Sequence, residues 1–265
     1  MRASILEAIV AASRRSSEVR ESRVPLASLK RRPRVAAGDD AFRRALRGDT
    51  AARGPRVIAE CKRRSPSSGI LRTDYEPAAI ALSYERAGAA AISVLTEPSF
   101  FDGDLPDLEV VRGVVQIPVL RKDFIVTRYQ VAEARDAGAD AVLLIVAALD
   151  DVALRELLTM AHDEGMEALV EVHDAHEVER ALAAGARIIG VNSRNLHTLA
   201  VDIEIFDQVA GMIPRDVTAV AESGIRDAAT MSRVGELGYH ACLIGERFMT
   251  TPDPGAALRT LLGRL

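Results

Sequence analysis

Short apolar runs recur along the chain, and each follows a helix-like stretch that ends at a glycine. The four glycines of this kind lie 50, 47 and 53 residues apart, at Gly88, Gly138, Gly185 and Gly238. Glycine is typical of a helix C-cap, and an unbroken β-branched, apolar run is typical of a strand buried on both faces. Four more strand-like runs lie between them, at residues 57–61, 118–120, 168–172 and 217–221. The pattern predicts eight strands with a helix after each.

Self-similarity at a fixed period indicates a repeat architecture, here four units of two βα pairs. Eight parallel strands in ~250 residues are typical of a closed (β/α)8 barrel, the TIM barrel. An open doubly wound sheet is the alternative, but regular alternation favours closure, and no GxGxxG motif follows the first strand. We therefore expect an α/β protein with a single TIM-barrel domain over residues 1–265. Residues 1–50 would form a helical N-terminal extension and residues 56–265 the barrel.

The N-terminal extension contains two helix-like segments. Ser4 and Glu7 have the spacing of a capping box, and one apolar face follows, formed by Ile5, Leu6, Ile9 and Val10. Residues 41–47 predict a second, short helix. We expect the extension to plug the bottom of the barrel or to pack on its side. Direct contact with a substrate, or a lid, is the alternative.

Composition and charge narrow the class of protein. The chain has 48% hydrophobic and 27% charged residues, which excludes disordered and fibrous classes. The formal net charge is −4 and no basic block is present, so a nucleic-acid partner is not indicated. No apolar run reaches the ~18 residues of a membrane span, and the N-terminus lacks a secretory signal. Two cysteines fit a reducing compartment. We expect a cytoplasmic enzyme with a small-molecule substrate, as a monomer or alternatively a dimer.

Lysine is rare in this chain. Of 34 basic residues only Lys30, Lys62 and Lys122 are lysines, and the rest are arginines. Arginine serves where only positive charge is needed, whereas a lysine can donate or accept a proton once its pKa is shifted. Lys30 lies in a basic run and needs no special explanation. Lys62 and Lys122 are candidates for chemistry.

Active sites of TIM barrels lie at the carboxyl ends of the strands. Side chains alternate along a strand, so Glu60 and Lys62 share the inward face of the first strand. The ends of three other strands supply Lys122, Glu171 and Asn192. Such a set can support several acid–base steps, and we expect burial and neighbouring cations to lower a lysine pKa. Structural ion pairs are the alternative.

The loops after the seventh and eighth strands carry phosphate-binding features. Ser223 and Gly224 follow one strand, and Gly245 and Glu246 follow the other, where barrels commonly hold a phosphate. Glycine allows close approach of the backbone, and Arg194 could add a guanidinium. We expect a branched side chain at position 224 to block that approach. Tight-turn glycines are the alternative.

Two further segments bear on the site. Residues 63–73 are long for a βα loop, which usually has ~2–6 residues, so we expect a lid over the mouth rather than a passive loop. His173 follows Glu171 at a strand end, where a hydrogen-bonded role is favoured over metal binding. The chain has neither an HExxH motif nor a Cys–His cluster, so we expect no metal site.

Six segments in order, at the expected strand ends, resemble the indole-3-glycerol phosphate synthase family. They are residues 58–69 (IAECKRRSPSSG), 119–125 (VLRKDFI), 169–173 (LVEVH), 189–196 (IGVNSRNL), 221–225 (AESGI) and 243–246 (LIGE). The resemblance covers essentially the whole chain. It implies the ring-closing step of tryptophan biosynthesis, in which 1-(2-carboxyphenylamino)-1-deoxyribulose 5-phosphate loses CO2 and water to give indole-3-glycerol phosphate. It also implies that no metal or organic cofactor is needed.

The resemblance implies a role for each catalytic candidate. Lys122 resembles the general acid that protonates the substrate carbonyl, and Glu171 resembles the acid–base partner in dehydration. Lys62 with Glu60 resembles the pair that contacts the substrate carboxylate or phosphate, and Lys62 is the alternative proton donor. Asn192 resembles the residue that holds a substrate hydroxyl.

The resemblance also assigns the binding residues. The phosphate side comprises Arg194, Ser223, Gly224, Gly245 and Glu246, and the apolar wall around the anthranilate ring comprises Phe101, Phe124 and Leu143. Ser65 and Leu196, within two of the matching segments, complete the binding set. Some relatives have serine in place of Glu246. Since a carboxylate would repel phosphate, we expect Glu246 to offer its backbone N–H and to point its side chain away.

Two other functions are alternatives for a barrel of this kind. Phosphoribosylanthranilate isomerase, a barrel of the same pathway, would need a cysteine base facing the mouth after the first strand, whereas Cys61 has outward parity. A catalytically silent barrel kept as an assembly partner is the second alternative, against which the set of charged strand-end residues argues.

Overall fold

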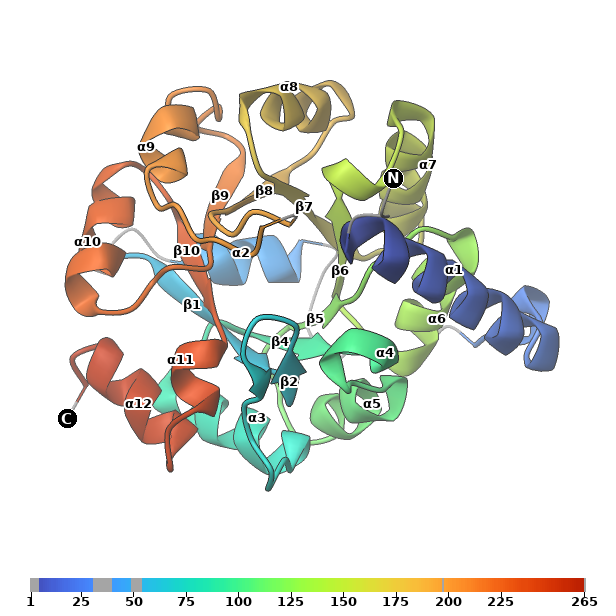
Figure 1. Cartoon of the computed structure of the whole chain (residues 1–265), viewed down its shortest axis with the longest axis horizontal. Coiled ribbons are helices and arrows are strands. Elements are labelled where there is room, and N and C mark those ends of the chain that lie inside the picture. The colour runs from blue at the N-terminus through green and yellow to red at the C-terminus, as the bar shows by residue number, and fades with distance from the viewer. Residues whose placement is uncertain (1–4, 31–39, 49–53, 197, 265) are drawn as a thin grey trace.

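The computed structural model describes residues 5–30, 40–48, 54–196 and 198–264, so Ser4 of the expected capping box lies outside the described residues. Eight parallel strands close into a barrel in the order β1-β10-β9-β8-β7-β6-β5-β4. Their bounds are β1 Arg56–Cys61, β4 Ala91–Leu95, β5 Val119–Lys122, β6 Ala141–Ile145, β7 Glu167–Val172, β8 Ile188–Asn192, β9 Thr218–Glu222 and β10 Ala241–Ile244. The predicted TIM barrel is confirmed (Figure 1).

Helices surround the barrel and alternate with its strands (Figure 1). The longer ones are α3 Pro77–Ala87, α5 Leu105–Arg112, α6 Arg128–Ala137, α7 Asp151–Asp163, α8 Ala175–Ala183, α9 Ile205–Ala210, α10 Ala228–Glu236 and α12 Pro254–Leu261. Short turns of helix are η1 Leu26–Ser28, η2 Val146–Ala148, α4 Pro98–Phe101 and α11 Glu246–Met249. Gly88 and Gly138 end α3 and α6 in the left-handed conformation, with φ of 97° and 94°, as their spacing predicted.

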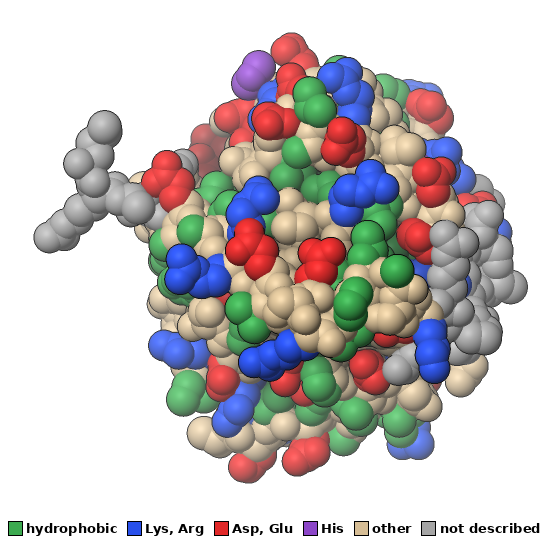
Figure 2. All heavy atoms as spheres, turned by 90° about the vertical axis from the view of Figure 1, so that its right-hand side faces the viewer, with side chains coloured by type: hydrophobic (Ala, Val, Ile, Leu, Met, Phe, Trp, Pro, Cys, Tyr) green, Lys and Arg blue, Asp and Glu red, His purple; other side chains and the backbone are tan. Residues whose placement is uncertain are grey.

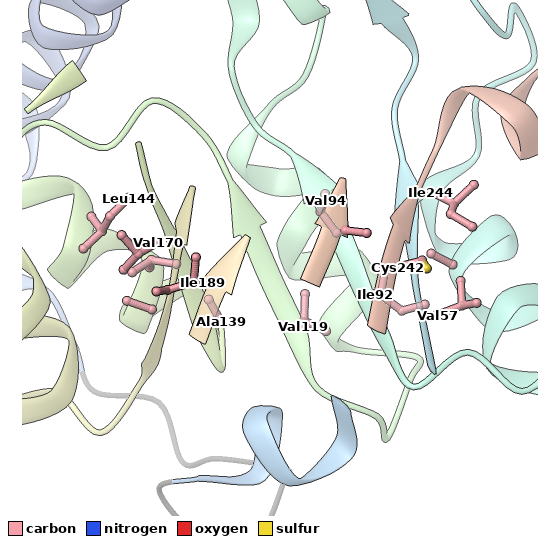
Figure 3. Close-up of a cluster of buried hydrophobic side chains, with 14 of the residues drawn as sticks. Val57, Ile92, Val94, Val119, Ala139, Leu144, Val170, Ile189, Cys242 and Ile244 are labelled. Atoms are coloured by element: carbon pink, nitrogen blue, oxygen red, sulfur yellow. The ribbon is translucent and has the colours of Figure 1, made fainter. Parts of the chain in front are cut away.

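Apolar side chains fill two concentric layers. Side chains that point outward from the strands pack against the helices, and Figure 3 shows part of this layer, with Val94, Val170 and Ile189. The residues of opposite parity fill the barrel interior, among them Leu120 and Leu169. At the carboxyl ends of the strands the inward-facing positions hold polar residues. These residues line the site, directly above the apolar interior layer.

The short helix α2, Ala41–Arg47, closes the opposite end of the barrel. Its Phe42 and Leu46 are fully buried and belong to the interior layer. Arg43 Nε lies 3.3 Å from Oε1 of Glu167, the first residue of β7, which fixes α2 against the amino ends of the strands. The predicted plug is therefore confirmed for this helix.

The long helix α1, Ile5–Arg23, lies across α6 near the carboxyl end of β6 (Figure 1). Ser13 Oγ donates to the carbonyl of Phe124 at 2.7 Å, and the guanidinium of Arg20 binds Glu133 of α6. Leu6 and Ile9 are buried at the mouth of the barrel. Helix α1 therefore does not plug the bottom of the barrel: it packs on the side against α6, as the second part of the expectation held, and its apolar face reaches the mouth.

Acidic and basic side chains lie interspersed on the face of the molecule in Figure 2. Within the described ranges, no helix combines the length and apolar character that a membrane crossing requires.

Candidate active site

A cavity of about 340 Å³ opens at the carboxyl ends of the barrel strands. Every site residue expected from the sequence lines it: Glu60, Lys62, Ser65, Phe101, Lys122, Phe124, Leu143, Glu171, Asn192, Arg194, Leu196, Ser223, Gly224, Gly245 and Glu246. These residues come from all eight barrel strands or the loops that follow them, so barrel closure alone brings them together.

Lys122 lies at the centre of the charged part of the cavity. Its Nζ donates to Oε2 of Glu171 at 2.8 Å and lies 3.3 Å from Oε2 of Glu222. A second pair stands beside it, with Lys62 Nζ 2.6 Å from Oε1 of Glu60. The side chains of Glu171 and Glu222 are each only 2% exposed, so their charges interact in a medium of low polarity.

The expected lowering of a lysine pKa is wrong for Lys122. Burial alone would lower its pKa, but the carboxylates of Glu171 and Glu222 outweigh burial and raise it above its ordinary value. For Glu171 burial acts in the opposite sense, and Lys122 and His173 lower its pKa well below the usual range. The pair is therefore ionised over the neutral pH range.

Glu222 is a candidate functional residue that the sequence analysis did not select. Burial, together with the neighbouring Glu171, raises its pKa to about 8 despite the attraction of Lys122. Its Oε1 is buried and has no hydrogen-bond partner in the described structure. Gly190 on β8 makes room for it, since a Cβ there would overlap this oxygen. Its inward parity on the seventh barrel strand was the signal that could have identified it.

The phosphate side departs from one expectation. The side chain of Glu246 does not point away: Ser68 Oγ donates to its Oε1 at 3.0 Å, and Arg194 Nη2 lies 3.4 Å from its Oε2. The guanidinium of Arg194 attracts the carboxylate across the loops after β8 and β10. The carboxylate of Glu246 is thus ion-paired with Arg194, the cationic side chain that we expected to bind the phosphate.

The two glycines of the phosphate side are required by the fold. Gly224 has φ of +73°, and a Cβ there would lie 2.6 Å from Ile203 Cγ2 and 3.1 Å from Ser193 Oγ. A side chain at position 224 would meet the loop after β8, which favours the tight-turn alternative for Gly224, and its effect on phosphate binding stays a prediction. A Cβ at position 245 would overlap the carboxylate of Glu60.

The rest of the cavity wall is apolar. Phe101 and Phe124 lie with ring centroids 6.0 Å apart, and Leu143 lines the same cavity. Ile5, Leu6 and Ile9 of α1 also line it, which favours the alternative that the N-terminal extension contacts the substrate. The loop over residues 63–73 forms a small hairpin of β2 (Arg64–Ser65) and β3 (Gly69–Ile70), from which Ser65, Pro66 and Ser67 face the cavity.

His173 is hydrogen-bonded, as expected: its Nδ1 lies 3.0 Å from Glu177 Oε2. Among the described residues, no group of three or more His, Cys, Asp or Glu side chains has the arrangement of a metal site. Cys61 is fully buried on the helix side of β1, with Sγ 4.0 Å from the carbonyl of Pro77. No cysteine base therefore faces the mouth from β1, as the isomerase alternative would need.

A closed (β/α)8 barrel whose mouth holds two lysine–carboxylate pairs and an arginine is typical of an acid–base barrel enzyme. The family model described as indole-3-glycerol phosphate synthase matches residues 6–261. The chain belongs to the indole-3-glycerol phosphate synthase family, whose members are carboxy-lyases of tryptophan biosynthesis.

Relatives with this name are similar over nearly their full length. The synthase of Saccharopolyspora erythraea is 49% identical over 98% of this chain and 95% of its own length. That of Parafrankia sp. is 52% identical over 94% of this chain and 91% of its own. That of Nocardioides sp. is 50% identical over 98% of both.

Two solved structures share the fold at low sequence identity. An N-acetylmannosamine-6-phosphate 2-epimerase from Clostridium perfringens superposes with a TM-score of 0.58 and 14% identity, over 74% of this chain and 88% of its own. A mandelate oxidase variant has a TM-score of 0.58 and 17% identity, over 79% of this chain and 71% of its own. These likenesses support the barrel fold alone.

Proposed function

We propose that the cavity converts 1-(2-carboxyphenylamino)-1-deoxyribulose 5-phosphate into indole-3-glycerol phosphate, with release of one CO2 and one water. The observation that carries this proposal is the position of Lys122, held between Glu171 and Glu222 in a cavity with aromatic side chains on its wall and Arg194 at its mouth. The substrate has an aromatic ring, a carboxylate and a phosphate, and the cavity offers a complementary group for each.

Lys122 is the general acid of ring closure. Because its pKa is raised, the side-chain amine of Lys122 is a protonated ammonium at neutral pH. This ammonium faces the cavity. As the aromatic carbon attacks the substrate carbonyl, the ammonium stabilises the negative charge on the oxygen and donates a proton to it. The family resemblance and the location of Lys122 support this assignment, with Lys62 as the alternative donor.

Decarboxylation follows from the substrate's own chemistry. Ring closure leaves a cationic imine, which accepts the electron pair as the bond to CO2 breaks, so the step needs no external electron acceptor. Lys62, paired with Glu60, is placed to bind the substrate carboxylate before it leaves. We therefore propose that the enzyme works without a metal or organic cofactor.

Decarboxylation restores the benzene ring, and dehydration then makes the new five-membered ring aromatic by loss of its hydroxyl group, as water, and of a ring proton. Glu171 is ionised and accepts the proton, while Asn192 orients the departing hydroxyl. Glu222, with its pKa near 8, is protonated at neutral pH and is the neighbouring acid. Two carboxylic acids with separated pKa values thus take opposite roles.

The remaining assignments follow from the cavity. Arg194, Ser223, Gly224 and Gly245 hold the phosphate end, to which Glu246 offers its backbone N–H while its carboxylate competes for Arg194. Phe101, Phe124 and Leu143, with Ser65 and Leu196, hold the anthranilate ring. We also propose a single-domain, cytoplasmic protein that works as a monomer, with a dimer as the alternative.

The proposal is tested by mixing purified protein with the carboxyphenylamino-deoxyribulose phosphate and following indole fluorescence, with and without a metal chelator. The expected result is product formation that the chelator leaves unchanged. Absence of product from folded protein would refute the proposed function, and loss of product with chelator would refute the cofactor-free mechanism.

A further inference from the structure

A chain of alternating acidic and basic side chains extends from the cavity to the start of α8. It runs through Glu222, Lys122, Glu171, His173 and Glu177, and each member lies within 3.3 Å of the next. The roles proposed above use only its first three members. His173 and Glu177 are 13% and 12% exposed, so they form a largely buried pair behind Glu171.

Glu177 fixes the orientation of His173. The backbone N–H of His173 donates to Glu177 Oε2 at 2.7 Å, and the imidazole Nδ1 lies 3.0 Å from the same oxygen. Glu177 is itself held in the first turn of α8, where its backbone N–H donates to the N-cap Asp174 at 2.8 Å. The ring is therefore oriented by the turn between β7 and α8.

The second imidazole nitrogen of His173 points toward Glu171 of the acid–base centre. Nε2 of His173 lies 3.3 Å from Oε1 of Glu171, whereas Lys122 binds Oε2. Each carboxylate oxygen thus has its own cation. Two separate partners restrict rotation of the carboxylate, as outer partners do for ligands in metal sites.

The charge of the imidazole depends on the groups around it. Burial would lower the pKa of His173, but Glu171 on β7 and Glu177 on α8 outweigh burial and raise it to about 10. Across the barrel, β5 presents Lys122 and β9 presents Glu222, while the Arg194 guanidinium after β8 pairs with Glu246. The neighbouring turn η2 carries no titratable side chain.

We propose that His173 is a positioning residue of the reaction: its imidazolium, oriented by Glu177, holds Oε1 of Glu171 so that Oε2 faces Lys122. This inference rests on the proposed acid–base role of Glu171. It assigns His173 no direct contact with substrate.

The first test is the variant His173→Phe. Loss of an orienting partner is expected to lower kcat about 10- to 100-fold with little change in KM. Because Glu171 also loses a neighbouring cation, its pKa rises and the acidic limb of the kcat–pH profile moves to higher pH. His176→Phe, at an exposed histidine in the first turn of α8, is the matched control and should behave as wild type.

The second test is Glu177→Gln, which keeps the size and one acceptor oxygen but removes the charge. The pKa of His173 then falls, so the imidazolium is lost at lower pH than in the wild type. We expect near-normal kcat in mildly acidic buffer and a loss of kcat that begins at lower pH than in the wild type, whose own alkaline loss follows deprotonation of Glu222 at its pKa of about 8. This variant decides the matter if His173→Phe does not fold.

Glu171→Gln separates the two proposals. Wild-type kcat in Glu171→Gln would refute the role of Glu171 itself. If Glu171→Gln is inactive while His173→Phe and Glu177→Gln keep wild-type kcat and pH profiles, the positioning role is overturned. A lower kcat with an unmoved pH profile and a lower Tm would also overturn it, because that result indicates a purely structural histidine.

Discussion

Glu222→Gln is expected to stabilise the protein at alkaline pH, although it alters the candidate active site. Burial raises the pKa of Glu222 from its ordinary value of 4.5 to about 8. A carboxyl group whose folded pKa is raised makes the folded state less stable as pH rises above its unfolded pKa. This loss in the free energy of unfolding grows with pH between the unfolded and the folded pKa of Glu222 and is constant above the folded one. Glutamine keeps the neutral form at every pH and avoids this cost.

The magnitude follows from the two pKa values. At 1.36 kcal/mol per pH unit, the interval corresponds to at most about 5 kcal/mol in the free energy of unfolding. For a chain of this length that is about 10 °C in Tm. Below about pH 4.5 the two proteins should be equally stable, since both then carry a neutral group.

Urea unfolding of wild type and Glu222→Gln at about pH 5, 7 and 9 measures this dependence. The matched control is Glu171→Gln, for which the sign reverses: the pKa of Glu171 is lowered, so its removal should destabilise the protein at neutral pH. A Glu222→Gln difference that does not grow with pH, or that has the opposite sign, would refute the electrostatic reasoning.

Three further substitutions test other parts of the structure. Glu246→Ser should lower KM by up to about 5-fold with unchanged kcat. The reason is that its exposed ion pair with Arg194, worth up to ~1 kcal/mol, no longer competes with phosphate. An unchanged or higher KM in steady-state assays would contradict this. Arg43→Met should lower the free energy of unfolding by about 3 kcal/mol, since it leaves the carboxylate of the buried Glu167 without the Arg43 guanidinium. In a Glu167→Gln background the same substitution should lower the free energy of unfolding only slightly. Equal losses in both backgrounds, measured by urea unfolding, would refute a stabilising ion pair. Gly224→Val should lower Tm sharply through its positive φ and crowded Cβ direction, and near-normal Tm by calorimetry would show that the loop adapts.

Much of the site could be predicted because it depends on strand parity. Once eight strands are placed, the inward positions at their carboxyl ends follow from a period of two, and Glu60, Lys122 and Glu171 are found from the sequence alone. Glu222 has the same parity and was within reach of the same argument. The raised pKa of Glu222 could not be predicted from the sequence, because it depends on the neighbouring Glu171 and on the close approach of the Glu222 side chain to the backbone at Gly190.

Other features depend on contacts between distant segments, which local patterns do not contain. The apolar face of α1 indicates that Leu6 and Ile9 are buried, but not whether they pack at the top or the bottom of the barrel. The position of Glu246 was predicted, whereas the direction of its side chain is set by Arg194 and Ser68. The pKa of Lys122 likewise follows from carboxylates on two other strands.

The most direct test of the central claim is the kcat of Lys122→Arg beside that of Lys62→Arg, measured by indole fluorescence. Arginine keeps the positive charge but does not give up a proton near neutral pH. If Lys122 is the proton donor, Lys122→Arg should lose about 10²- to 10⁴-fold in kcat with KM largely kept, and Lys62→Arg should act mainly on KM. Retention of more than about a tenth of wild-type kcat in Lys122→Arg, with the large loss in Lys62→Arg instead, would contradict the account and assign the proton to Lys62.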